Sequence, residues 1–146
     1  DASPSSSSSS CFGAAASRPF ARALATQAEE GPLVQLDTAG AGGVARMTLR
    51  RPSKLNSLSL PMILELKQRY ADLVKAGSRC LLLGGEGRAF CAGGDVAEVR
   101  EGILENDPRP ADFFYEEYAL DYQIATLRAR EGIVQVALWD GIVMGG

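Results

Sequence analysis

Two glycine pairs, each placed directly after an apolar segment, are the residues in this sequence best suited to chemistry. Gly93-Gly94 follows the segment 89–92, and Gly145-Gly146 follows the segment 142–144. Glycine lets a ligand approach the backbone closely, and N–H groups just before a helix have no partner within that helix. Each pair can therefore offer backbone donors to a phosphate or an oxyanion. The alternative is that each pair only forms a turn.

The spacing of the two pairs favours an oxyanion site. They lie about 50 residues apart and are separated by segments with helical patterns, so their strands can end side by side. Two such strand ends can direct two N–H groups at one point, which is the arrangement of an oxyanion hole. The sequence Gly93-Gly94-Asp95 is neither a phosphate-binding P-loop nor part of a G-x-G-x-x-G dinucleotide pattern.

The lack of histidine narrows the chemistry further. With no His in the chain, Ser-His-Asp and Cys-His catalysis and H-E-x-x-H zinc binding are excluded here, and we expect no metal site. Cys11, Cys80 and Cys91 show neither C-x-x-C nor zinc spacing, so we interpret them as reduced thiols. Cys91 lies close to the first glycine pair, but without a histidine we interpret it as a packing residue. Carboxylates and backbone N–H groups remain as the sources of chemistry.

The overall composition indicates a soluble globular protein. Of the 146 residues, 46% are hydrophobic and 23% are charged, and the formal net charge is −3. A nucleic-acid groove needs a basic surface, and a membrane span needs about 20 consecutive apolar residues. The sequence shows neither feature, so we expect no nucleic-acid partner and no membrane partner.

Alternating strand and helix patterns predict an α/β domain that positions the two glycine pairs. In the predicted strands apolar residues alternate or form continuous runs, and in the predicted helices they recur on one face. In chain order the predicted elements are strands over 33–36 and 44–49, a helix to about 75, a buried strand over 80–83, a helix over 111–128 and a buried strand over 133–138. A glycine-rich turn over 40–43 and an irregular loop over 51–56 connect the first of them.

Two helix starts can be read from the sequence. Ser59 is placed to cap the helix that runs to about Lys75, and Gly77 is placed to end it. Asp95, with Glu98 three residues later, forms a capping-box pattern that opens a short helix directly after the first glycine pair.

Residues 1–30 differ in character from the rest of the chain. They contain a run of serines over 5–10, two arginines and no acidic residue between Ala2 and Ala28. This composition is typical of an organelle transit peptide, and a disordered low-complexity tail is the alternative. We predict a transit peptide over residues 1–30 and one folded domain over residues 31–146. Because the chain starts with Asp and stops at a glycine pair, we expect a fragment of a longer protein.

Three segments together resemble the crotonase (enoyl-CoA hydratase/isomerase) superfamily. They are Arg51-Pro52 with Asn56-Ser57-Leu58, the segment 89–96, and the segment 140–146. The G-G-D form of the first glycine pair and the Phe-Phe-Tyr-Glu-Glu-Tyr segment over 113–118 are similar to the 3-hydroxyisobutyryl-CoA hydrolase branch. The similarity runs from about residue 33 to the last residue. It implies a crotonase-type fold, a spiral of ββα repeats, of which the chain holds the N-terminal portion only.

The resemblance also implies roles for individual residues. The N–H groups of Gly94 and Gly146 match the two oxyanion-hole donors that polarise the thioester carbonyl of an acyl-CoA. Glu117 matches a glutamate that contacts the substrate, and Gly146 is implied to contact the substrate as well. The alternative for Glu117 is that it is a solvated charge beside Glu116. The residues implied to lie along the CoA are Lys54, Leu55, Ala92, Gly93, Asp95 and Val96.

The activity implied by the resemblance is hydrolysis of 3-hydroxyisobutyryl-CoA to the free acid and CoA, as in valine breakdown in mitochondria. The implied partner is an acyl-CoA substrate, with no cofactor besides the CoA that the substrate carries. A hydratase or isomerase reaction and a non-catalytic crotonase-like subunit of an organellar complex are the alternatives.

The family's acid–base carboxylates lie beyond Gly146. We therefore expect the 146-residue chain alone to be inactive, and we expect a homo-oligomer only for the full-length protein. One departure from the family pattern is that Arg130-Glu131-Gly132 stand where a Lys-Pro pair is usual.

Overall fold

The computed structural model describes residues 31–38 and 40–145, and the predicted transit peptide and Gly146 lie outside the described residues. The strands are β1 (Val34–Asp37), β2 (Val44–Leu49), β3 (Cys80–Gly85), β4 (Ala89–Cys91), β5 (Val134–Ala137) and β6 (Ile142–Val143). The helices are α2 (Leu60–Lys75), α3 (Val96–Leu104) and α4 (Arg109–Glu131), with short 3-10 turns at η1 (Ala41–Gly43) and η2 (Pro52–Lys54).

A four-stranded sheet with the order β1-β2-β3-β5 forms the centre of the described part. β1 pairs antiparallel with β2, whereas β2 with β3 and β3 with β5 pair in parallel. β4 and β6 form a separate parallel pair. Parallel strands connected by helices confirm the predicted α/β class.

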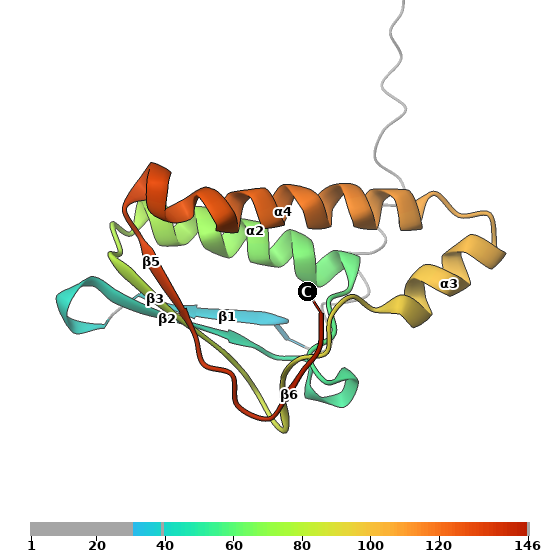
Figure 1. The fold of residues 1–146 in the computed structure, drawn as a ribbon, viewed down its shortest axis with the longest axis horizontal. Coiled ribbons are helices and arrows are strands. Elements are labelled where there is room, and N and C mark those ends of the chain that lie inside the picture. Colours follow the sequence, from blue (N-terminus) through green and yellow to red (C-terminus); the bar gives the residue numbers. More distant parts are fainter. Residues whose placement is uncertain (1–30, 39, 146) are drawn as a thin grey trace, which may run out of the picture.

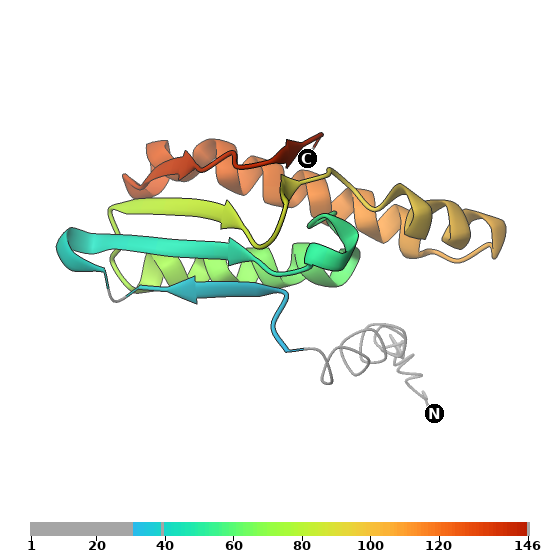
Figure 2. The ribbon, with the colours of Figure 1, turned by 90° about the horizontal axis from the view of Figure 1, so that it is seen from below.

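Helices α2 and α4 lie side by side over one face of the four-stranded sheet, and α3 projects beyond the end of the sheet (Figure 1). Figure 2 shows the opposite face, which none of the described helices covers. The core therefore lies between the sheet and the helix layer. Its fully buried side chains come from β1, β2, β3 and α2, and they include Val34, Met47, Leu49, Met62, Ile63, Tyr70, Leu73 and Leu81.

Helix α2 forms where the apolar spacing and the cap predicted it. The side chain of Ser59 accepts a hydrogen bond from the Met62 N–H, and a proline occupies the first turn, where it removes no internal bond. Its buried residues recur at helical spacing and face the sheet. The chain leaves the helix through Gly77, whose φ of +65° favours glycine. This prediction is confirmed.

Three elements differ from the sequence prediction. Helix α4 is longer than expected, because it continues to Glu131 and ends at Gly132, which has a φ of +70°. The segment that departs from the family pattern is thus the last turn of this helix. The short strands β4 and β6 lie where a strand was expected before each glycine pair, but the predicted order of elements did not include them.

The strand over 133–138 was predicted to be buried, and this is wrong for most of its residues. Only Ile133 is buried, whereas Val134 and Val136 are 42% and 41% exposed. Gln135 lies on the helix side, where it accepts a hydrogen bond of 2.6 Å from the Tyr70 hydroxyl. The physical reason is that β5 is an edge strand whose two valines point to the face that the described helices leave open.

Candidate active site

The two glycine segments lie side by side at the ends of β4 and β6. The pair is parallel, and the Met144 N–H donates to the Cys91 carbonyl over 2.9 Å. A Cβ atom built on Gly93 would lie 2.8 Å from the Met144 carbonyl oxygen, and the φ of Gly93 is +85°. No side chain fits there, so glycine is required by both space and conformation. The predicted meeting of the two segments is thus present up to Gly145, whereas Gly146 lies outside the described residues.

Gly94 presents an unpaired backbone donor at this junction. Among the described residues no acceptor for its N–H is found, although the amides of both neighbours, Gly93 and Asp95, are hydrogen-bonded. A Cβ atom on Gly94 would lie 3.1 Å from the Phe113 ring and 3.6 Å from a carboxylate oxygen of Glu117. The donor, the aromatic ring and the carboxylate therefore meet in one place, which is what oxyanion and substrate binding require.

The loop over 51–58 holds the first glycine segment from its other side. The amide of Leu58 donates to the Gly93 carbonyl over 2.8 Å, and the amide of Asp95 donates to the Leu58 carbonyl over 2.8 Å. The Ala92 amide donates to the Leu55 carbonyl over 3.1 Å. The residues predicted to lie along the CoA, from Lys54-Leu55 and from 92–96, are thus brought together. That they contact CoA stays a prediction.

Asn56 links this loop to the turn between β3 and β4. The side chain is completely buried, its oxygen accepts from the Arg51 amide over 2.8 Å, and its nitrogen donates to the carbonyls of Glu86 and Ala89 over 3.0 and 2.8 Å. The φ of Asn56 is +54°, a conformation that asparagine tolerates better than most residues. Every polar atom of this buried side chain is thereby satisfied.

Arg51 connects the same loop to the start of α3. Its guanidinium lies 2.7 Å from a carboxylate oxygen of Asp95, and the two side chains are only 19% and 12% exposed. Asp95 caps α3 by accepting from the Glu98 amide, as the sequence predicted. Burial alone would raise the pKa of Asp95, but the hydrogen bonds from Arg51 and from the Glu98 N–H together with the arginine charge lower it.

The two adjacent glutamates on α4 have different surroundings. Glu116 forms an ion pair with Lys67 on α2. Glu117 faces Gly94, and burial together with the charge of Asp121 raises its pKa. The alternative that Glu117 is simply solvated is therefore the weaker one, because its carboxylate is partly buried at the junction.

Cys91 has the properties of a packing residue. It is 5% exposed, and burial raises the pKa of its thiol although the Gly93 N–H donates to the sulfur. A raised pKa keeps the thiol protonated and unreactive at neutral pH. Cys80 and Cys91 are both free, and Cys11 lies outside the described residues.

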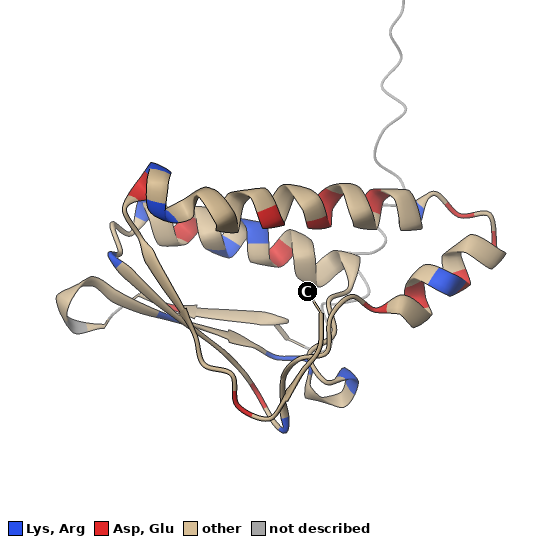
Figure 3. Ribbon diagram, viewed as in Figure 1, with Lys and Arg blue, Asp and Glu red and all other residues tan. Residues whose placement is uncertain are grey.

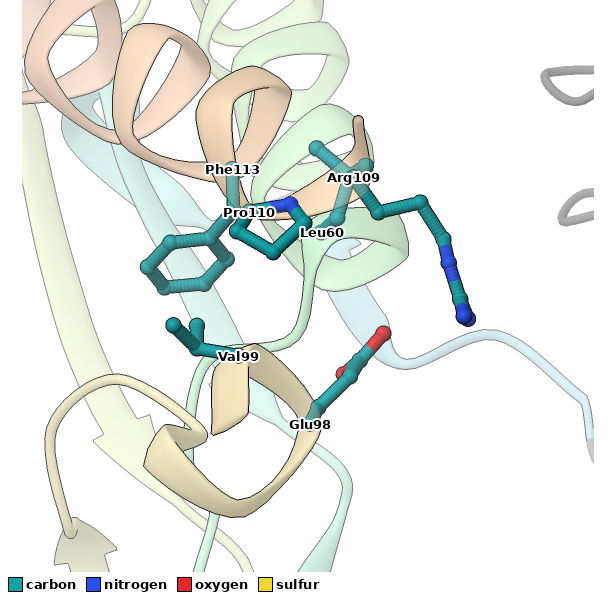
Figure 4. A pocket seen from close by; sticks show the side chains of 6 residues that line it. All are labelled: Leu60, Glu98, Val99, Arg109, Pro110 and Phe113. Carbon is teal, nitrogen blue, oxygen red and sulfur yellow. The ribbon is translucent and has the colours of Figure 1, made fainter. Parts of the chain in front are cut away.

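A small pocket lies next to this junction, between α3 and the first turns of α2 and α4. Figure 4 shows the Phe113 ring facing Val99 across the pocket, with Glu98 and Arg109 toward its other side. Burial and the charge of Asp95 raise the pKa of Glu98. The same Phe113 ring lies 3.1 Å from the Cβ position of Gly94, so it borders both the pocket and the glycine junction.

Charges of both signs are distributed along the helices, and no basic stripe crosses the view in Figure 3. Within the described residues no helix is both long enough and apolar enough to cross a membrane. The same part of the chain contains no group of three or more His, Cys, Asp or Glu residues that could hold a metal ion.

Sequence reasoning did not assign site roles to Arg51, Asn56 or Phe113. Arg51 and Asn56 belong to a segment that the resemblance had already singled out, but the partners of their side chains are not visible in a sequence. Phe113 was placed on a helix by its apolar character and belongs to the segment over 113–118 that resembles the hydrolase branch, but no contact was predicted for it.

Comparison with known proteins places the chain in a family. Residues 44–146 match the family model described as Enoyl-CoA hydratase/isomerase. A solved structure, a carnitinyl-CoA dehydratase from Mycobacterium thermoresistibile, is similar with a TM-score of 0.66 and 33% identity over 79% of this chain and 33% of that one. The chain therefore belongs to the crotonase (enoyl-CoA hydratase/isomerase) family and has the N-terminal part of its fold.

The chain is also similar to curated relatives that are named 3-hydroxyisobutyryl-CoA hydrolases. The chain is 44% identical over 102 residues to 3-hydroxyisobutyryl-CoA hydrolase 1 of Arabidopsis thaliana, covering 68% of this chain and 26% of that protein. It is 39% identical over 115 residues to the mitochondrial 3-hydroxyisobutyryl-CoA hydrolase of Mus musculus, covering 77% of this chain and 28% of that protein. The chain thus spans about a quarter of the length of these relatives.

Proposed function

We propose that the complete protein that carries this chain hydrolyses 3-hydroxyisobutyryl-CoA to 3-hydroxyisobutyrate and CoA. The observation that carries the proposal is the N–H of Gly94, which follows the end of a strand, has no acceptor among the described residues, and belongs to a residue whose Cβ position lies 3.6 Å from the Glu117 carboxylate. The similarity to relatives named 3-hydroxyisobutyryl-CoA hydrolase supports this acyl group over others. We propose in addition that the reaction serves valine breakdown in mitochondria. The mouse relative is named as a mitochondrial protein, which supports the location.

In the proposed reaction the thioester carbonyl oxygen accepts a hydrogen bond from the Gly94 N–H, and from the N–H of Gly146 as the second donor. Donors fixed by the fold stabilise the charge that develops on this oxygen when water attacks the carbonyl carbon. Glu117 would contact the acyl group, and the backbone of Lys54-Leu55 and of 92–96 would lie along the CoA. The groups that activate water are proposed to lie in the part of the protein that follows this chain.

The first test is the reaction itself. The complete protein is expected to release free CoA thiol from 3-hydroxyisobutyryl-CoA, measured with a thiol-reactive dye. Hydration of crotonyl-CoA, followed by the loss of enoyl absorbance, would favour the alternative hydratase reaction of the wider family. Binding of acyl-CoA without turnover of either substrate would favour the non-catalytic alternative.

The second test concerns the Gly94 donor. Gly94→Pro removes the N–H and is expected to lower kcat by about 10²–10³-fold, which is typical for the loss of one oxyanion donor. Gly94→Ala is the matched control, because it keeps the N–H and adds only a methyl group 3.1 Å from Phe113. The control should keep most of the activity, and both variants should keep a native circular dichroism spectrum. Equal activity of the two variants would show that the N–H does not act on the substrate.

A further inference from the structure

Arg51 donates to three acceptors that belong to two residues far apart in the sequence, Ser57 and Asp95. One nitrogen of its guanidinium, Nη1, donates to the Asp95 carboxylate over 2.7 Å and to the carbonyl and hydroxyl oxygens of Ser57 over 3.0 and 3.1 Å. The side chain is 19% exposed, whereas the neighbouring Arg50 is 40% exposed and pairs only with Glu86. The two adjacent arginines thus have different surroundings.

The Asp95 carboxylate has two opposite effects at this place. As the cap of α3 it satisfies a free N–H, and a negative charge is favourable at the positive end of a helix. However, Asp95 directly follows Gly94, so its carboxylate is only one residue away from the N–H that would bind a substrate oxygen. Like charges repel strongly where water is excluded, and an unneutralised carboxylate here would oppose negative charge on that oxygen.

The positive groups that act on Asp95 are Arg51 and Lys54, and only Arg51 is hydrogen-bonded to it. Lys54 is exposed, so its charge is screened by solvent. The other acidic group close by is Glu98, which adds negative charge to the same helix start. Neutralisation of Asp95 therefore depends mainly on Arg51.

We propose that Arg51 is a positioning residue of the active site. It neutralises the carboxylate next to Gly94, and through Ser57 it fixes the loop that hydrogen-bonds to the Gly93 carbonyl and the Asp95 amide. Both effects keep the Gly94 N–H available to a substrate oxygen. The rate effect rests on the proposed function, whereas the effect on the backbone does not.

A double-mutant cycle in the complete protein tests the electrostatic part. Asp95→Asn removes the charge and keeps the helix cap, because asparagine caps as well as aspartate. Arg51→Gln alone is expected to lower kcat about 10- to 100-fold, with a smaller change in KM, since it leaves a carboxylate unpaired. In the Asp95→Asn background the same change should cost less than about 5-fold in kcat. Arg50→Gln, the matched control, should keep wild-type activity.

An equal loss of kcat from Arg51→Gln in both backgrounds would overturn the electrostatic role, and so would wild-type activity of the single variant. Amide hydrogen exchange of residues 92–96 provides the readout that does not need turnover. It should become several-fold faster in Arg51→Gln and stay unchanged in Arg50→Gln. If the wild-type protein releases no CoA, the proposed function fails, and the amide exchange alone tests the positioning role. Unchanged exchange rates of residues 92–96 in Arg51→Gln would then overturn that role as well.

Discussion

Replacement of Asn56 by alanine should destabilise the protein more than any other single polar-to-alanine change in the loop over 51–57. The side chain is fully buried and makes three hydrogen bonds, to the Arg51 amide and to the carbonyls of Glu86 and Ala89. The Ala89 carbonyl is left in a buried place, where an unsatisfied group costs about 1–3 kcal/mol. The two other groups are partly exposed, and losing their partners costs about 1 kcal/mol each.

The backbone adds a smaller contribution. With a φ of +54°, residue 56 is in the left-handed region, where alanine is about 1 kcal/mol less favourable than asparagine. The sum is a loss of about 4–6 kcal/mol in the free energy of unfolding, which is large for one residue. The comparison of urea denaturation curves of the complete wild-type and variant proteins, followed by circular dichroism, measures it.

Asn106 is the matched control, because its φ is +53° but its side chain is exposed and makes none of these bonds. Asn106→Ala should therefore cost only the backbone contribution of about 1 kcal/mol. Asn56→Gly gives the complementary control, because it removes the three hydrogen bonds and permits the left-handed conformation. Equal losses for Asn56→Ala and Asn106→Ala would refute the reasoning, since the buried hydrogen bonds would then contribute nothing.

Two further predictions follow from the helix α4 and from the N-terminal segment. Burial and the charge of Asp121 raise the pKa of Glu117, so ionisation of Glu117 opposes folding as the pH rises. Glu117→Gln should therefore stabilise the protein at pH 7. The difference in the free energy of unfolding between variant and wild type should vanish below the ordinary carboxyl pKa of 4.5. Glu116→Gln should not stabilise at any pH, because it removes the ion pair with Lys67, and stabilisation by both variants would contradict the assignment. Residues 1–30 fused to a fluorescent reporter should direct it to mitochondria, and a diffuse cytosolic signal would contradict the transit-peptide prediction.

The parts of the fold that the sequence predicted well are those with a local cause. The start of α2 follows from the Ser59 cap and from apolar spacing over four turns, and the start of α3 follows from Asp95 with Glu98. β2 alternates buried apolar residues with Arg46 and Thr48, β3 contains a continuous apolar run, and turn residues bound both strands. Such signals depend on neighbouring residues only, and tertiary packing reinforces them.

The parts that were missed or wrong depend on contacts between distant segments. β4 and β6 have three and two residues, too few for a visible pattern, and they exist because they pair with each other. The apolar run over 133–138 predicted a strand correctly but not its exposure, because periodicity does not tell which faces a neighbouring layer covers. The pairing of the two glycine segments was inferred from their spacing. The Arg51–Asp95 ion pair joins positions 44 residues apart, and no sequence pattern indicates it.

The loop after β2 explains how a backbone donor can be fixed in a site that offers few side chains for chemistry. Two of its side chains connect it to different elements. The Asn56 side chain hydrogen-bonds to the β3–β4 turn, and the Arg51 side chain hydrogen-bonds to the start of α3. Loss of Asn56 removes hydrogen bonds that exist only in the folded chain, so it should lower stability first and activity as a consequence. Loss of Arg51 leaves those bonds in place but leaves the carboxylate next to Gly94 unpaired, so it should lower kcat by more than its loss of stability explains. The two phenotypes should therefore separate, although the residues are five positions apart on one loop and the Arg51 amide itself donates to the Asn56 side chain.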